Sequence, residues 1–172
     1  MLATPASRPA LFLGRALPFI ANGLVVSAFG FAVGVLLLDF SPAAGSVPAL
    51  ALVVLVTTCS CTALGMFIGS IGLRARDVFF AANLVYFLML LVCGVNVAID
   101  RLPGWMQAIG NVVPLTHGIE AARDVANGSS LGDVSGLVAA EAFIGLAYAT
   151  GAYVLFRIFE AEGRRRASLE TF

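Results

Sequence analysis

Charged side chains are scarce in this chain of 172 residues, making up 12% of the sequence against roughly 25% in an average soluble domain. This scarcity excludes an ordinary soluble fold. Lysine is absent, because all ten basic residues are arginines. A P-loop places a lysine against the nucleotide phosphates, so ATP hydrolysis by a P-loop in this sequence is excluded. The ten acidic residues balance the arginines, which leaves no basic stripe for binding nucleic acid.

The residues that usually bind metals are also few. The chain has one histidine, and its three cysteines all lie inside apolar runs, where thiols behave as small hydrophobic side chains. These cysteines are Cys59, Cys61 and Cys93. We therefore expect neither a disulfide framework nor a metal site. No nucleophile, base and orienting group occur at an interpretable spacing, so the sequence does not indicate an enzyme.

Hydrophobic residues make up 60% of the chain and gather in four continuous runs. About 20 apolar residues in a helix cross a bilayer, and each run reaches that length. Backbone groups cannot stay unpaired in lipid, and barrel strands would alternate in polarity, so we expect helices. The predicted fold class is all-α, a polytopic membrane protein with four transmembrane helices. These cover residues 17–38, 47–73, 78–98 and 134–159.

The arginines predict which side of the membrane each loop occupies, because short loops rich in basic residues stay in the cytoplasm. They flank the spans in three places, at Arg8 and Arg15, at Arg74 and Arg76, and at Arg164, Arg165 and Arg166. We therefore expect a cytoplasmic N-terminal segment (1–16) and a cytoplasmic tail (160–172). The loops 39–46 and 99–133 then lie outside. The richness in alanine, glycine and arginine indicates a bacterial protein, and hence the plasma membrane as its location.

The outer segment 99–133 is too polar to cross the membrane, yet it is patterned. The motif Leu-Pro-Gly-Trp at 102–105 is typical of a helix start, with tryptophan at the lipid–water boundary. Pro114 ends this first short helix. A second one begins after Thr116, a candidate N-cap, and stops at the Asn-Gly pair 127–128. Two interpretations stay open: a re-entrant helical hairpin that dips into the outer leaflet, or a helical cap that lies flat on the membrane.

Three motifs in this hairpin resemble those of a known family. They are LPGWMQ at residues 102–107, VPLTH at 113–117 and EAAR at 120–123, followed by a glycine-containing turn and a last span. Together they resemble the C-terminal signature of the type-two ATP-binding-cassette (ABC) exporter permeases, most strongly from residue 65 to 159. Six spans are usual in that family, with the hairpin between the fifth and sixth. The four spans here therefore correspond to the third to sixth.

The resemblance implies a permease subunit that works in the lipid membrane as a homodimer or heterodimer, with a separate ABC ATPase as partner. ATP and Mg are then bound by that ATPase, and no cofactor by this chain. The expected substrate is an amphipathic drug, lipid or lipid-linked glycan. Two alternatives stay open: a four-span scaffold or immunity-type protein that transports nothing, and a small ion-coupled transporter.

The resemblance also predicts two sets of site residues, an outer gate in the hairpin and an ATPase contact in the turn between the second and third spans. The gate residues are Pro103, Trp105, Pro114, His117, Glu120 and Arg123. The contact residues are Arg74, Arg76 and Asp77. Membrane topology alone also accounts for the two arginines of this turn. Glu120 and Arg123 have the spacing of an ion pair on one helix, and His117 also fits a purely turn-forming role.

Polar side chains inside predicted spans form a third set, because an ionised group there is costly and is a functional candidate. Glu141 lies about 10 Å into the last span at ~1.5 Å per residue, and it is a candidate for gating or for lining the substrate path. Alternatively, its carboxyl group is paired or protonated near the outer interface. Asn83 and Asn96 are further path-lining candidates, with hydrogen bonding between helices as the alternative.

Glycine pairs four residues apart occur in the first two spans, at Gly30 and Gly34 and at Gly65 and Gly69. Small residues at this spacing allow two helices to approach closely in a membrane. Such pairs are common in spanning helices, so they indicate close packing without identifying one interface.

Overall fold

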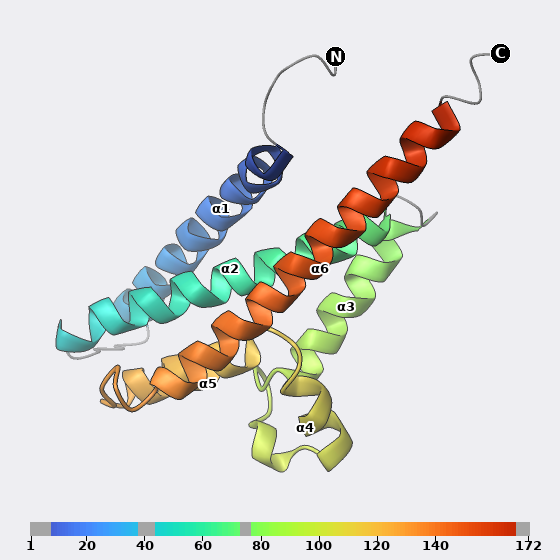
Figure 1. Cartoon of the computed structure of the whole chain (residues 1–172). Helices are drawn as coiled ribbons and strands as arrows, with labels where there is room; N and C mark the ends of the chain where they lie inside the picture. Colours follow the sequence, from blue (N-terminus) through green and yellow to red (C-terminus); the bar gives the residue numbers. More distant parts are fainter. Residues whose placement is uncertain (1–7, 38–43, 73–76, 168–172) are drawn as a thin grey trace.

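The computed structural model describes residues 8–37, 44–72 and 77–167, and the elements in these ranges are all helices (Figure 1). The main helices are α1 (Arg8–Leu37), α2 (Val47–Gly72), α3 (Val78–Val92) and α6 (Ser135–Ala167). The short elements are the 3-10 helices η1 (Ala44–Ser46) and η2 (Ile99–Arg101) and the helices α4 (Gly104–Gly110) and α5 (Thr116–Ala126). The predicted all-α fold class is confirmed.

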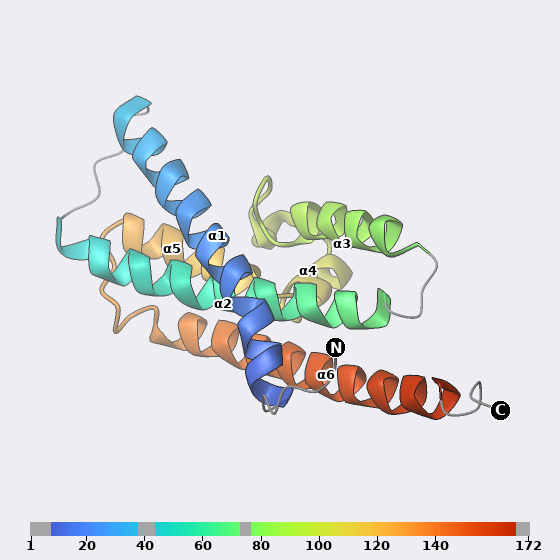
Figure 2. The same cartoon turned by 90° about the horizontal axis from the view of Figure 1, so that it is seen from above.

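The central helix is α2, which contacts α1, α3, α5 and α6. Helices α2 and α6 run side by side in the same direction and make the most extensive contact, while α1 crosses α2 (Figures 1 and 2). Helix α5 packs against both α2 and α6. The start of α1 and the C-terminal ends of α2 and α6 lie toward one end of the bundle, and α4 and α5 lie toward the other.

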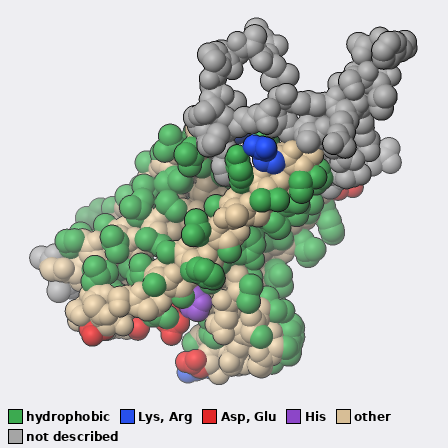
Figure 3. All heavy atoms as spheres, in the orientation of Figure 1, with side chains coloured by type: hydrophobic (Ala, Val, Ile, Leu, Met, Phe, Trp, Pro, Cys, Tyr) green, Lys and Arg blue, Asp and Glu red, His purple; other side chains and the backbone are tan. Residues whose placement is uncertain are grey.

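Three described helices are long and apolar enough to cross a membrane, and they cover Leu13–Leu37, Val47–Ile71 and Ser135–Phe159. The apolar helix Phe79–Val92 is shorter. Hydrophobic side chains cover most of the face in Figure 3. Many large ones are exposed, and Phe79 reaches 88%. Such a surface suits lipid as the solvent rather than water, and the chain is therefore a polytopic helical membrane protein.

The third membrane helix is shorter than the predicted span of residues 78–98, because α3 ends at Val92. Beyond it, Gly94 has a φ of +75°, a left-handed conformation that glycine adopts readily and that does not continue a right-handed helix. The Asn96 side chain also folds back and donates a hydrogen bond to the Leu90 carbonyl oxygen at 3.3 Å. At ~1.5 Å per residue, the 15 residues of α3 span about 22 Å of a hydrocarbon core of roughly 30 Å. The described chain thus has three full-length spans and one shorter apolar helix instead of the four expected.

Small side chains let α2 and α6 approach closely. A Cβ atom added at Gly145 of α6 would lie 2.9 Å from the Cα atom of Ser60 on α2, closer than real Cβ contacts. The Ser60 hydroxyl donates to the carbonyl oxygen of Glu141 at 3.3 Å, and the Ser70 hydroxyl reaches the carbonyl oxygen of Ala152 at 3.4 Å. Lipid tails are as apolar as leucine, so close van der Waals packing of such residues holds membrane helices together.

We predict that the substitution Gly145→Ala weakens the contact between α2 and α6. The new methyl group meets a backbone atom of Ser60, which cannot rotate away, and overpacking of this kind costs about 1–3 kcal/mol. Gly136→Ala in the same helix is the control, because a Cβ atom there meets nothing within 4 Å. Thermal unfolding in detergent should show a lower Tm for Gly145→Ala alone, and equal Tm values for the two variants would contradict the prediction.

Candidate functional site

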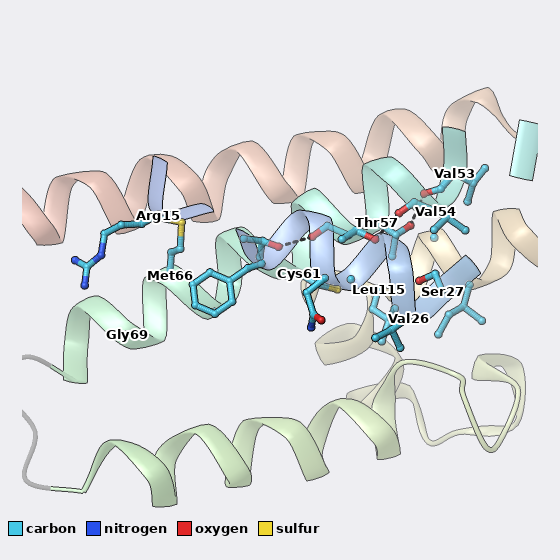
Figure 4. Close-up of a pocket in the computed structure, with 18 of the residues that line it drawn as sticks. Arg15, Val26, Ser27, Val53, Val54, Thr57, Cys61, Met66, Gly69 and Leu115 are labelled. Atoms are coloured by element: carbon cyan, nitrogen blue, oxygen red, sulfur yellow. Dashed lines mark hydrogen bonds between the residues drawn. The ribbon is translucent and has the colours of Figure 1, made fainter. Parts of the chain in front are cut away.

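An open groove of about 1090 Å³ lies between α1, α2 and α5 (Figure 4). Its wall is largely apolar and takes side chains from each of the three helices. Examples are Phe19 and Val26 on α1, Val54 and Met66 on α2, and Ile119 on α5. Pockets for drug-sized ligands usually measure roughly 300–1,000 Å³, so the groove has room for a ligand at or above that size. It is the first candidate for a binding site.

Threonine hydroxyls in the groove are already paired within their own helix. Thr57 donates to the carbonyl oxygen of Val53 at 2.8 Å, and Thr58 donates to that of Val54 at 2.7 Å. Thr62 does the same with the carbonyl oxygen of Thr58 at 2.8 Å. A donor bonded to its own helix is not free to bind a ligand. This part of the wall therefore offers a ligand fewer hydrogen bonds than its sequence indicates.

Among the described residues that line the groove, Arg15 is the only charged one. It lies at the same end as Gly69, whereas Leu115 lies toward the other end, with Ser27 and Val53 farther along (Figure 4). The Arg15 side chain is exposed, and it makes no hydrogen bond or ion pair with another described residue. The groove is thus amphipathic, with a positive charge at one end of an apolar wall.

The carboxylate of Glu141 lies beneath the start of α5. Its Oε1 atom accepts a hydrogen bond from the Leu115 N–H at 2.8 Å, and Oε2 accepts one from the Gly118 N–H at 3.3 Å. The first N–H groups of a helix lack partners within it, and the helix dipole favours a negative charge there. The expected cap at Thr116 is wrong, because α5 begins at that residue and has no side-chain cap at its N-cap position. Helix α6 supplies the acceptor instead.

Glu141 is fully buried, with 0% of its surface exposed, and it is not among the described residues that line the groove. The structure places it under the hairpin, paired with backbone donors, rather than on an open path. Burying a polar group without hydrogen-bond partners is costly, so these two hydrogen bonds help to fix the position of α5. A direct role of Glu141 in gating or path lining stays a prediction.

The turn before α5 holds an unusual backbone conformation. Leu115 has a φ of +88°, in the left-handed region that residues other than glycine, asparagine and aspartate rarely enter. Such a residue costs of order 1–3 kcal/mol and persists only where its surroundings hold it. Here the bond from the Leu115 N–H to Glu141 and the burial of Pro114 hold the turn. Strain fixed in this way clusters at sites that bind ligands or switch conformation.

Helix α5 also packs closely against α2. A Cβ atom added at Gly118 would overlap the Thr57 side chain, so only glycine permits this approach. Apolar residues of α2, α5 and the start of the last span form one core cluster beside this contact, comprising Leu50, Val53, Ala121, Val125 and Val134. The second helix of the hairpin is therefore packed into the bundle and forms one wall of the groove.

Arg123 ties α5 to the end of α3. Its Nη2 atom donates to the carbonyl oxygen of Gly94 at 2.8 Å and to that of Val95 at 3.3 Å. The predicted ion pair between Glu120 and Arg123 is absent among the described residues, because the guanidinium group is used for these two carbonyls and Glu120 is exposed. Charge-assisted bonds of this kind satisfy carbonyl groups left open where α3 ends.

The other predicted gate residues lie around α4 and its turn to α5. Pro103 is the N-cap residue of α4, and Trp105 on that helix is 63% exposed. Pro114 is buried in the turn. His117 is half-buried, and its Nε2 atom lies 3.3 Å from the carbonyl oxygen of Asn111. The six residues thus share the hairpin without converging on one point.

A turn that the sequence did not reveal leads from α5 to α6. The Ser130 hydroxyl donates to Oδ2 of Asp133 at 2.7 Å, and the Ser130 N–H donates to the same oxygen at 2.9 Å. These bonds, the one from the hydroxyl above all, lower the pKa of Asp133 below its usual range. The carboxylate therefore stays ionised and fixes the entry into the last span.

Three further predicted residues, Asn83, Asn96 and Asp77, are not among the residues that line the groove. Asn83 on α3 is exposed and donates to the carbonyl oxygen of Phe79 in its own helix at 2.8 Å. Asn96 is exposed beyond the end of α3, and neither side chain links two main helices within the described residues. Asp77 is exposed just before α3. Arg74 and Arg76 lie outside the described residues.

We predict that Glu141→Ala loosens the start of α5. The substitution leaves two buried N–H groups without an acceptor, and each such group costs about 1–3 kcal/mol. Hydrogen–deuterium exchange should become faster at residues 115–118, together with a lower Tm. Glu141→Gln keeps one acceptor oxygen and should have a smaller effect, and Glu120→Gln, an exposed acid on α5, should have none. Unchanged exchange at 115–118 in the alanine variant would contradict the proposed cap.

Comparison with protein families gave one match, to a family described as ABC-2 type transporter, over residues 1–126. The matched part runs through α1, α2, α3, α4 and α5 and includes all groove residues except Phe156. Comparisons with curated proteins and with solved structures gave no match.

Proposed function

The chain belongs to the ABC-2 type transporter family and is a membrane component of an ABC transporter, and we propose that it forms the export path for an amphipathic substrate. One observation carries the proposal. The helices matched by the family enclose a large groove with an apolar wall and a charged end. A molecule that is itself part apolar and part charged is the ligand that such a groove favours.

The energy for export comes, in this proposal, from a separate ATPase. The chain contains no lysine for a P-loop, so ATP and Mg are bound by that partner. The partner docks at the end of the bundle where α2 ends and α3 begins, near the exposed Asp77. Arg74 and Arg76, which precede Asp77 in the sequence, are the further contact residues of this proposal. A complex with two permease chains, identical or different, and two ATPase subunits completes the transporter.

Motion reaches the groove through α2. This helix contacts α1, α5 and α6, and it supplies one wall of the groove. A shift of α2 against α6 therefore changes both the shape of the groove and the position of α5. Because Glu141 and Arg123 tie α5 to α6 and to the end of α3, the hairpin moves as one piece and acts as the outer gate. Packed interfaces of this kind switch between discrete arrangements rather than deform smoothly.

The proposed orientation places the hairpin outside and both chain ends in the cytoplasm of a bacterial cell. The segment 99–133 offsets Arg101 and Arg123 with Asp100, Glu120, Asp124 and Asp133, and acidic side chains are seen along the lower edge of Figure 3. The packing of α5 beside Thr57, ten residues into α2, supports the re-entrant interpretation over a flat cap. At ~1.5 Å per residue that position lies about 15 Å along the spanning helix.

Capture of the ATPase tests the proposal directly. We predict that the full-length chain, purified from its own host in mild detergent, retains a subunit that an azido-ATP probe labels covalently. The permease band itself should stay unlabelled, since it holds no P-loop. ATP hydrolysis by the captured complex should require that subunit. Enrichment of no ATP-binding protein over an unrelated membrane protein prepared in parallel would contradict the proposal.

The orientation is tested by labelling single cysteines in a chain whose own three cysteines are replaced. A membrane-impermeant maleimide should modify Asn127→Cys, an exposed position after α5, in intact cells. The same reagent should modify Arg165→Cys only after the membrane is permeabilised, because basic flanks stay in the cytoplasm. The reverse pattern would place the hairpin inside and would remove the outer gate.

A further inference from the structure

The groove carries a charge at one end only, and this asymmetry identifies a class of ligand. We propose that the groove binds a phosphate-bearing anionic lipid, with its headgroup at Arg15 and an acyl chain along the wall toward Leu115. The proposal rests on the proposed function, for which it names the substrate class. It commits to a lipid of the membrane rather than to a sugar, a peptide or a free anion.

The wall favours an acyl chain because it is largely apolar and the hydroxyl donors of its threonines are already used. The hydroxyls of Thr57, Thr58 and Thr62 are bonded to their own helix. On α1, Asn22 and Ser27 also contribute polar side chains to the groove. A sugar in this position would give up hydrogen bonds to water without replacing most of them, whereas an acyl chain gives up none.

The groove is long enough for a lipid chain. Its lining residues on α2 run from Val53 to Ser70, about 25 Å at ~1.5 Å per residue. One leaflet of the hydrocarbon core is about half of roughly 30 Å. A lipid that entered from the leaflet at the Arg15 end would therefore fit lengthwise within the groove, with its chain parallel to α2.

The Arg15 end has room for a headgroup. Gly69 of α2 lies at the same end as Arg15 (Figure 4) and carries no side chain, and a Cβ atom added there would meet nothing within 4 Å. Among the described residues the guanidinium group has no hydrogen-bond or ion-pair partner. Arginine binds phosphate with two parallel N–H donors, which makes a lipid phosphate the matching group.

Lipid binding to the purified full-length chain tests this site by native mass spectrometry. The probes are phosphatidylglycerol, phosphatidylcholine with the same acyl chains, and inorganic phosphate as competitor. The wild-type chain should prefer phosphatidylglycerol. Arg15→Gln should weaken phosphatidylglycerol binding roughly tenfold and remove the preference. Arg15→Lys should keep the preference, and Arg157→Gln, an exposed arginine on α6 outside the groove, should bind as the wild type does.

A second pair of variants tests the acyl-chain part of the groove. Asn22→Phe should block binding of both lipids by filling the groove, while Ala21→Phe, at the neighbouring exposed residue outside it, should not. Asn22→Leu keeps a similar size and should retain binding, which separates blockage from loss of the amide. Unchanged lipid binding by Asn22→Phe, or a preference that survives Arg15→Gln, would overturn the proposal.

Competition by inorganic phosphate as effective as that by the lipid would also overturn it, since the site would then bind a free anion. A cross-link between two copies through a cysteine at position 22 would assign the groove to a second chain instead. The assay contains no ATPase, so failure of lipid binding is distinguishable from failure of ATPase capture. Unchanged Tm values for the variants confirm that they are folded.

Discussion

The carboxylate of Glu141 is the constraint on which the outer half of the molecule depends. A polar group buried in a membrane protein needs hydrogen-bond partners, and here the partners of the carboxyl oxygens are two N–H groups at the start of α5. This pairing determines the position of the hairpin, because moving α5 would leave both the carboxyl oxygens and the donors unsatisfied. This geometry requires a left-handed φ at Leu115. It also requires glycine at position 118, because the Thr57 side chain leaves no room for a Cβ atom there.

The shape of the groove depends on the same placement of α5. Helix α2 packs tightly on α6 through Ser60 and Gly145, and other parts of its surface contact α1 and α5, of which α5 also packs on α6. The position of α5 determines one wall of the groove, and α1 forms another. The groove lies between α2 and α5, and α5 is bonded to α6. Binding of a ligand in the groove is therefore coupled to the position of the hairpin. Leu115 and Gly118 make this coupling direct, because both line the groove and both donate a backbone hydrogen bond to Glu141.

Composition and hydrophobic runs predicted the helical class and its main helices, because in lipid the backbone must pair within each segment. They did not predict the end of α3, which Gly94 and the distant Arg123 determine together. The paired glycines 65 and 69 have open space around them, whereas Gly23, Gly110, Gly118 and Gly145 are in close contact with neighbouring elements. These glycines look alike in the sequence, and only the neighbouring helix distinguishes them.

Polarity in such a groove is set by which donors remain unpaired rather than by which residues are present. Three threonines on α2 give the sequence of the wall a polar appearance, yet each hydroxyl is used by a carbonyl four residues earlier. Asn22 and Ser27 on α1 add polar side chains, and the one charge among the described lining residues is Arg15 at one end. A ligand that lacks an anionic group gains nothing from Arg15. A ligand with too many polar groups loses solvation along the rest of the wall. The two conditions together favour a single polar head and a long apolar body.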